Sequence, residues 1–126
     1  MARSMLGTPF LHQGRMPGIG LDCIGLILVT ARRLGLTDFD FDVYPRQPSG
    51  DRLVRAARAA GLVETARPAP GDVLCLRFER DPQHLGFRTE RGILHASERA
   101  GGVVEHRMDA LWRARIVTAF RFEGID

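Results

Sequence analysis

Apolar residues are spaced as in helices in the first half of the chain and as in short strands in the second half. The stretch from Cys23 to about Leu34 contains no proline and is apolar nearly all the way round, which predicts a centrally buried helix that ends at Gly35. The stretch from Asp51 to Ala60 places its apolar residues on one face and arginines on the other, which predicts an amphipathic helix closed by Gly61.

The last third of the chain reads as short strands separated by turns rich in Gly, Asp and Pro. The predicted strands are Val73–Phe78, His84–Arg88, Gly92–Ala96, Val103–His106 and Arg115–Phe122, with a short helical turn over Asp109–Arg113. Helices followed by a strand meander indicate an α+β fold, in which N-terminal helices pack on an antiparallel meander of about five strands. No repeat or linker divides the sequence, so we expect a single domain over residues 1–126.

Two further segments have a recognisable pattern. Residues 6–14 contain proline and glycine breakers and read as a shaped loop. Residues 38–43 alternate acidic and apolar side chains, which predicts an extended segment with one buried face. The three acids also resemble a calcium-binding loop, but the glycine and closing glutamate of that loop are absent.

Composition narrows the possible partners. All 18 basic residues are arginines, the net charge is +3, and acids lie between the arginines, so no nucleic-acid-binding patch is indicated. Weak affinity for an anionic envelope polymer stays open. No run is long enough to cross a membrane and no signal peptide is recognisable, so we expect synthesis in the bacterial cytoplasm without membrane insertion.

Cys23 is the first candidate for chemistry. Asp22 is a natural N-cap for the helix, which puts Cys23 at the first helical position, where free amides and the helix dipole favour a thiolate. The charge of Asp22 opposes ionisation, so a dominant thiolate needs a positive partner such as a histidine. The alternative is that Cys23 is only a small buried hydrophobic residue.

Two histidines supply such a partner. With a two-residue turn at Thr89-Glu90, His84 and His95 face each other across a hairpin, and a turn one residue later makes them diagonal neighbours on the same face. One imidazole then takes the thiol proton and the other orients its ring. Alternatively, both are ordinary surface histidines. His12 and His106 are further candidates, although His106 ends a strand and is expected at the surface.

The same side chains allow other uses. Cys23, His84 and His95 with His12 or Asp22 are a possible zinc ligand set, but a thiolate facing a histidine pair needs no metal, and we expect no metal or other cofactor. Cys23 and Cys75 lack zinc-motif spacing, and a cytoplasmic origin argues against a disulfide between them. The sequence contains no asparagine, so none completes a catalytic triad.

Three motifs in order resemble the NlpC family of papain-like cysteine peptidases. They are Gly20-Leu21-Asp22-Cys23-Ile24-Gly25-Leu26, Pro70-Gly71-Asp72-Val73-Leu74, and His84-Leu85-Gly86-Phe87 followed by Gly92-Ile93-Leu94-His95-Ala96. The resemblance spans residue 6 to about residue 97. It implies a papain-like fold with Cys23 as nucleophile, His84 as general base and His95 as the polar third member.

The resemblance also implies where such a protein acts. Residues 6–15, and the tail from Leu111 to Phe122, look more like the subgroup encoded in phage-tail and gene-transfer-agent clusters. This implies cleavage of peptidoglycan stem peptides, typically between γ-D-glutamate and diaminopimelate, by a protein carried to the periplasm on a virion. Tail-tip or baseplate proteins are then its partners.

The sequence departs from the family pattern at two positions, and other functions stay open. Phe10 replaces a tyrosine of many members, so His12 or Gln13 is expected to substitute beside the Cys23 amide in an oxyanion hole, and Asp22 is a further substrate-side candidate. Ile24 replaces a serine, which predicts a more apolar pocket rim. One alternative is a structural tail component with a latent site, and another is a related amidase or acyltransferase.

Overall fold

The computed structural model describes residues 2–36, 50–78 and 82–122. The helical elements are η1 (Ala2–Met5), α1 (Cys23–Arg33), α2 (Arg52–Ala59) and α3 (Ala110–Ala114). The strands are β1 (Arg15–Met16), β2 (Gly20–Leu21), β3 (Leu62–Glu64), β4 (Val73–Arg77), β5 (Pro82–Arg88), β6 (Ile93–Ser97), β7 (Gly102–His106) and β8 (Ile116–Phe122). Every predicted helix and strand between Cys23 and Phe122 is confirmed except the extended segment at 38–43, which, like the calcium-loop alternative, lies outside the described residues.

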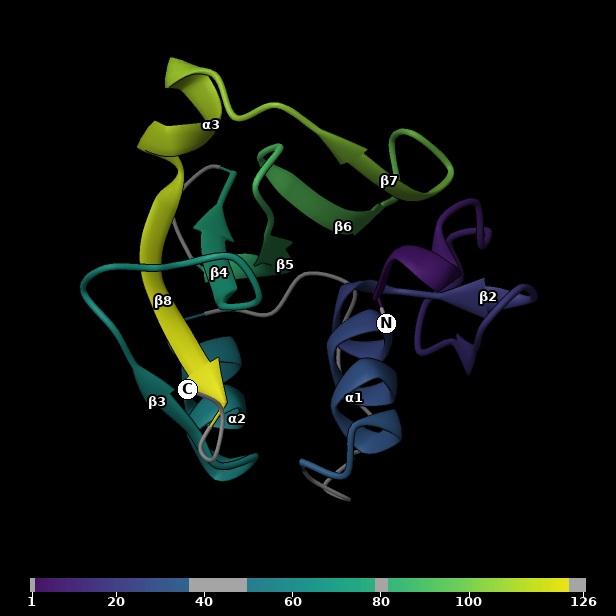
Figure 1. Ribbon diagram of the computed structural model, residues 1–126, viewed down its shortest axis with the longest axis horizontal. Coiled ribbons are helices and arrows are strands. Elements are labelled where there is room, and N and C mark those ends of the chain that lie inside the picture. The colour runs from purple at the N-terminus through teal and green to yellow at the C-terminus, as the bar shows by residue number, and fades with distance from the viewer. Residues whose placement is uncertain (1, 37–49, 79–81, 123–126) are drawn as a thin grey trace.

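The main sheet has six strands in the order β3-β8-β4-β5-β6-β7, and all the strand pairs are antiparallel (Figure 1). The strands β4 to β7 form the predicted meander. The sheet holds the predicted strands and one more, β3, which pairs with β8 near the end of the chain. The last strand, β8, returns across the meander and inserts between β3 and β4.

The motif Pro70-Gly71-Asp72 fixes this return. Gly71 has a φ of +96°, a conformation that favours glycine, and it starts the turn into β4. The buried Asp72 carboxylate accepts hydrogen bonds from the Ala69 amide and from both Nε and Nη2 of Arg121 on β8, at 2.8, 3.1 and 2.8 Å respectively. The turn motif therefore ties the last strand to the first strand of the meander.

The two faces of the sheet carry separate apolar clusters. On one face α1 and α2 pack against side chains that include Leu85, Phe87 and Phe120, and this is the larger core. On the other face Leu74, Leu76, Ile93 and Ala119 form a smaller core, covered by Met108, Trp112 and Ile116. Ile24 lies in the larger core, so it does not form the predicted pocket rim.

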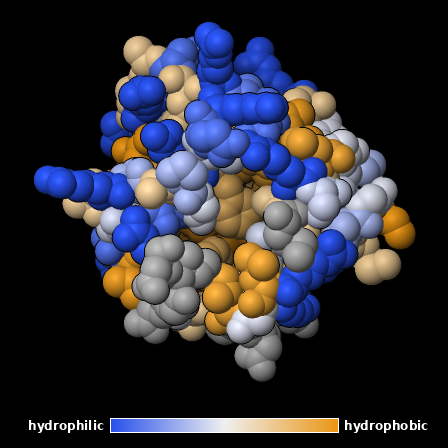
Figure 2. Space-filling model, in the orientation of Figure 1, coloured by the Kyte–Doolittle hydropathy of each residue, from blue (hydrophilic) through white to orange (hydrophobic). Residues whose placement is uncertain are grey.

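The surface offers polar and apolar regions on the face seen in Figure 2. Apolar residues line a depression near the centre of this view, and hydrophilic residues crowd its upper rim. In the described parts of the chain, no helix is long and apolar enough to cross a membrane.

Candidate active site

The N-terminus of α1 places Cys23 at the first helical position, as predicted. Asp22 is the N-cap: its Oδ1 accepts a hydrogen bond of 2.7 Å from the Gly25 amide. Its Oδ2 accepts a second, also of 2.7 Å, from the Gln13 amide. The carboxylate is buried and stabilises both the helix start and the preceding loop.

The same carboxylate collects side chains from that loop. Arg15 Nη1 lies 3.3 Å from Asp22 Oδ1, and His12 Nδ1 lies 3.9 Å from Oδ2. A Cβ built on Gly25 would lie 2.0 Å from the carbonyl oxygen of Gly14, so only glycine lets the loop approach the helix this closely. His12, Gln13 and Asp22 therefore meet beside Cys23, where Asp22 serves as the cap.

The surroundings of Cys23 favour the protonated thiol over the thiolate. Burial, followed by the charge of Asp22, raises its pKa to about 12, against smaller opposing effects of hydrogen bonds from the backbone of Leu85 and Ile24. The prediction that the helix N-terminus and a histidine pair hold an ionised thiol was therefore wrong for the unliganded protein. The two favourable amides are outweighed because burial of the thiol by the neighbouring protein disfavours the charged thiolate more than they favour it.

The sulfur of Cys23 contacts β5, the strand that carries His84. These strands pair at Phe87–Leu94 and Arg88–Ile93, and within the described residues their pairing does not continue toward Leu85. The Leu85 backbone instead hydrogen bonds with the sulfur of Cys23. Because Leu85 follows His84 directly, Cys23 lies next to the strand segment that carries the predicted base.

The two histidine rings meet as the sequence predicted. His84 Nε2 lies 2.7 Å from His95 Nδ1, and both side chains are buried. The register is the later of the two considered, because Thr89 and Gly92 close the turn and Phe87 faces Leu94. His84 and His95 are thus diagonal neighbours on one face of the sheet.

Gly86 makes room for this contact. A Cβ on Gly86 would lie 2.8 Å from Ile93 Cδ1 and 3.0 Å from His95 Cβ. Real Cβ contacts are almost never this short, so a side chain here would push the neighbouring strand away. The glycine of the His-x-Gly motif is therefore a packing requirement of the histidine pair.

Burial keeps both rings neutral. It lowers the pKa of His84 to about 3, with a smaller contribution from His95. It lowers the pKa of His95 to about 4, with a smaller contribution from His106. The resting site therefore contains a neutral thiol and neutral imidazoles.

Aromatic side chains that sequence reasoning did not assign to the site cover the histidines. The ring centroid of Phe78 lies 5.2 Å from that of His84, and Trp112 lies 5.1 Å from His95. Arg115 stacks on both, at 5.2 and 4.9 Å from the Phe78 and Trp112 centroids. The sequence contains one tryptophan, which follows an N-cap aspartate, but no periodicity links it to the histidines.

His106 extends the pair to a row of three rings. Its Nε2 lies 2.9 Å from His95 Nε2, and its Nδ1 lies 2.8 Å from the carbonyl oxygen of Arg107. His106 ends β7 as predicted and stays partly exposed, while both of its ring nitrogens are engaged in contacts. The register of β6 and β7 accounts for this contact. His106 pairs with Ile93, and Ile93 and His95 are two residues apart, so all three side chains lie on one face of the sheet.

The remaining predictions concern a possible metal site and a possible disulfide bond. In residues 2–36, 50–78 and 82–122, no group of three or more His, Cys, Asp or Glu side chains is placed to hold a metal ion. The facing nitrogens of the three rings contact one another instead. Cys23 and Cys75 are both free thiols, and Cys75 is buried within the sheet.

Comparison with known proteins places the fold. The chain is similar to the NlpC/p60 domain of the peptidoglycan hydrolase SagA, with a TM-score of 0.63 and 21% identity over 96% of this chain and 92% of that chain. The fold is thus α+β and papain-like, of the NlpC/p60 type, as the sequence resemblance implied. No protein-family model matches the sequence, and a search of curated proteins finds no match.

Proposed function

We propose that this protein is a cysteine peptidase that cleaves peptidoglycan stem peptides with Cys23, His84 and His95. The observation that carries the proposal is that Cys23, at a helix start, hydrogen bonds with the backbone of Leu85, the residue that follows His84 of the buried, hydrogen-bonded histidine pair. The structural neighbour is named as a peptidoglycan hydrolase, which supports this substrate class. The γ-D-glutamyl–diaminopimelate bond is the expected point of cleavage.

The chemistry follows from the neutral resting state. The sulfur attacks the amide carbonyl while His84 takes the thiol proton, and the resulting imidazolium gives that proton to the leaving amine. His84 then removes a proton from water, which attacks the thioester and releases the acid, and the proton returns to the sulfur. The Cys23 amide with His12 or Gln13 stabilises the oxyanion in each step.

Digestion of purified muropeptides tests the proposal. The expected products carry a new amine and a new acid end, identified by mass spectrometry, and Cys23→Ala abolishes their formation. Cys75→Ala is the matched control, since it removes the other thiol and should retain activity. Intact muropeptides after prolonged incubation with protein whose Cys23 alkylates stoichiometrically would count against a peptidase.

We further propose that the protein acts as part of a phage-like tail, with tail-tip or baseplate proteins as partners. The loop at residues 6–15 and the tail from Leu111 to Phe122 support this, as both resemble the tail-associated subgroup. A virion-borne enzyme would be delivered to the periplasm together with the particle. Co-purification with assembled particles, and its loss from tail-less mutants, is the expected result.

A structural role in the tail is the second candidate, and the raised pKa of Cys23 favours it. A thiol that stays protonated until something changes around it is the state expected of a latent site. In particles, Cys23→Ala then leaves infectivity unchanged while deletion of the chain blocks assembly. Loss of infectivity by Cys23→Ala in normally assembled particles would instead support the peptidase.

A further inference from the structure

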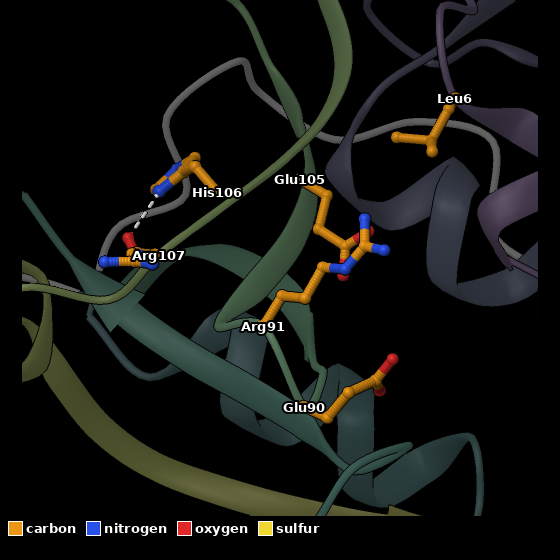
Figure 3. A pocket seen from close by; sticks show the side chains of 6 residues that line it. All are labelled: Leu6, Glu90, Arg91, Glu105, His106 and Arg107. Carbon is orange, nitrogen blue, oxygen red and sulfur yellow. Dashed lines mark hydrogen bonds between the residues drawn. The ribbon is translucent and has the colours of Figure 1, made fainter.

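The third ring of the histidine row is held by the main chain. His106 is the last residue of β7, and its Nδ1 faces the Arg107 carbonyl oxygen at 2.8 Å (Figure 3). A carbonyl oxygen only accepts hydrogen bonds, so the proton in this contact belongs to His106 Nδ1. One end of the row therefore has a fixed donor.

This fixed donor sets the direction of the next bonds. A neutral imidazole carries one N–H, so His106 Nε2 has a lone pair and must accept from His95 Nε2 at 2.9 Å. His95 Nδ1 is then an acceptor, and His84 must donate through Nε2 across 2.7 Å. The remaining lone pair of the row is on His84 Nδ1.

The His84–His95 pair alone does not determine this outcome. Its single hydrogen bond can run in either direction with neutral rings, and only one direction leaves His84 Nδ1 able to accept a proton. In the reverse arrangement His84 carries its proton on Nδ1 and cannot act as a base there. A third group is needed to select the productive arrangement.

We infer that His106 is a positioning residue that selects the base-competent tautomers of His95 and His84 through its bond to the Arg107 carbonyl. The inference rests on the proposed peptidase function for its catalytic meaning, while the tautomers themselves are independent of it. His106 touches neither substrate nor sulfur in this scheme and acts through His95.

The surroundings hold His106 in place. The Trp112 ring lies 4.8 Å from His106 and 5.1 Å from His95, so one side chain packs on both rings. The His106 carbonyl passes within 2.2 Å of the Cβ position of Gly92, which has a φ of +147° and admits only glycine. Side chain and main chain of His106 are thus both constrained.

Nitrogen NMR of ¹⁵N-histidine-labelled protein tests the tautomers directly, at about pH 8, where exposed histidines are neutral. The expected spectrum shows His84 and His95 protonated at Nε2 and His106 protonated at Nδ1. Protonation of His95 at Nδ1 would overturn the inference. This readout needs no substrate, so it holds whether or not the protein cleaves muropeptides.

Two variants test the consequence for catalysis. His106→Gln keeps an acceptor oxygen at about the reach of Nε2, so it should retain the His95 tautomer and most of kcat/KM. His106→Leu removes the acceptor, so His95 should populate both tautomers and kcat/KM should decrease at least about tenfold. Equal activity and unchanged His95 signals in the leucine variant would overturn the inference.

The two proposals fail in different ways. If no variant hydrolyses muropeptides but the tautomers are as expected, the proposed peptidase function is wrong, and the inference that His106 selects the tautomers is supported. If the parent protein hydrolyses muropeptides but the tautomers are reversed, the peptidase function is supported, and the inference that His106 selects the tautomers is wrong. Thermal unfolding of both variants identifies any loss of activity that comes from loss of fold.

Discussion

The thiol pKa of Cys23 reflects a balance of burial and one nearby charge against two backbone hydrogen bonds. Burial and Asp22 raise the thiol pKa, while the backbone of Leu85 and Ile24 lowers it. The Asp22 carboxylate is buried and caps α1, so its charge stays beside the thiol. In the proposed peptidase mechanism, the thiol proton therefore passes to His84 during attack.

Alkylation kinetics test this balance in a Cys75→Ala background, which leaves one thiol. Iodoacetamide should react slowly near neutral pH and steadily faster above about pH 9, since only the thiolate reacts. Asp22→Asn removes the adjacent charge, so its rate profile should move to lower pH. An identical profile in both proteins would show that burial alone sets the thiol pKa.

Replacement of Asp22 also affects stability. Asp22→Ala removes the acceptor for the Gly25 and Gln13 amides, so the free energy of unfolding should decrease by about 1–3 kcal/mol, measured in urea. Asp22→Asn keeps one acceptor oxygen and should lose less. Equal stability of the alanine variant and the parent would contradict the capping role.

Gly86 is the residue on which the histidine contact depends most directly. Gly86→Ala places a methyl group against Ile93 and His95, which should cost about 1–3 kcal/mol of stability and separate the rings. Muropeptide cleavage should decrease more than stability accounts for. Adding Ile93→Val removes the nearest atom and should recover part of the stability, and no recovery would show that the strain lies elsewhere.

At the scale of elements, the sequence was most informative where local signals determine structure. Asp22 and the apolar run after it predicted α1 to within a residue, and turn residues bounded the strands of the meander. A short helical turn over Asp109–Arg113 was also expected, and α3 forms there. Such signals act within a few residues and need no knowledge of the fold.

Non-local pairing was beyond the sequence. Nothing in the three residues of β3 indicates a partner near the C-terminus, yet Leu62 pairs with Phe122. The end of the β5–β6 pairing at Phe87–Leu94, and the cover of His95 by Trp112, also arise from tertiary packing. The contact of His84 with His95 could be predicted because both lie on one hairpin, whereas His106 comes from a third strand.

The helix α3 carries Trp112, so destabilising this helix tests how Trp112 covers the histidine rings. Asp109 caps it by accepting from the Trp112 amide at 2.9 Å, and Trp112 packs on His95 and His106. Asp109→Ala should lower the free energy of unfolding by about 1 kcal/mol and loosen Trp112, whereas Asp109→Asn should be nearly neutral. Urea unfolding followed by fluorescence reports this, because Trp112 is the only tryptophan in the chain.

For the whole molecule, the site lies where two separate cores meet. The larger core orients α1 and hence Cys23, and the smaller core, on the opposite face of the sheet, lies under Trp112 beside the histidine row. Leu85 belongs to the first core and His84 precedes it in the same strand. The relative position of Cys23 and His84 therefore depends on the integrity of the whole sheet, and the burial of neutral histidines becomes part of its stability.

This coupling predicts that, as the pH is lowered, the free energy of unfolding begins to decrease at an unusually high pH. The pKa values of His84 and His95 are about 3 and about 4, below the ordinary 6.5, so between pH 6.5 and about 4.5 the unfolded chain binds protons that the folded chain does not. The free energy of unfolding should then decrease by up to about 2.7 kcal/mol per pH unit, for two protons. The paired carboxylates of Asp72 and Glu105 have lowered pKa values and contribute below this window.

Urea midpoints measured between pH 8 and pH 4 check the prediction. They should be flat above about pH 7 and decline steadily below about pH 6.5. Replacing His84 and His95 together with glutamine removes both titrating groups, so the decline should shift to the lower pH at which carboxylates protonate. Constant midpoints of the parent protein down to pH 4.5 would contradict the prediction. They would mean that His84 and His95 have the same pKa values in the folded and unfolded chain, so the conclusion that both rings are neutral in the folded protein would be wrong.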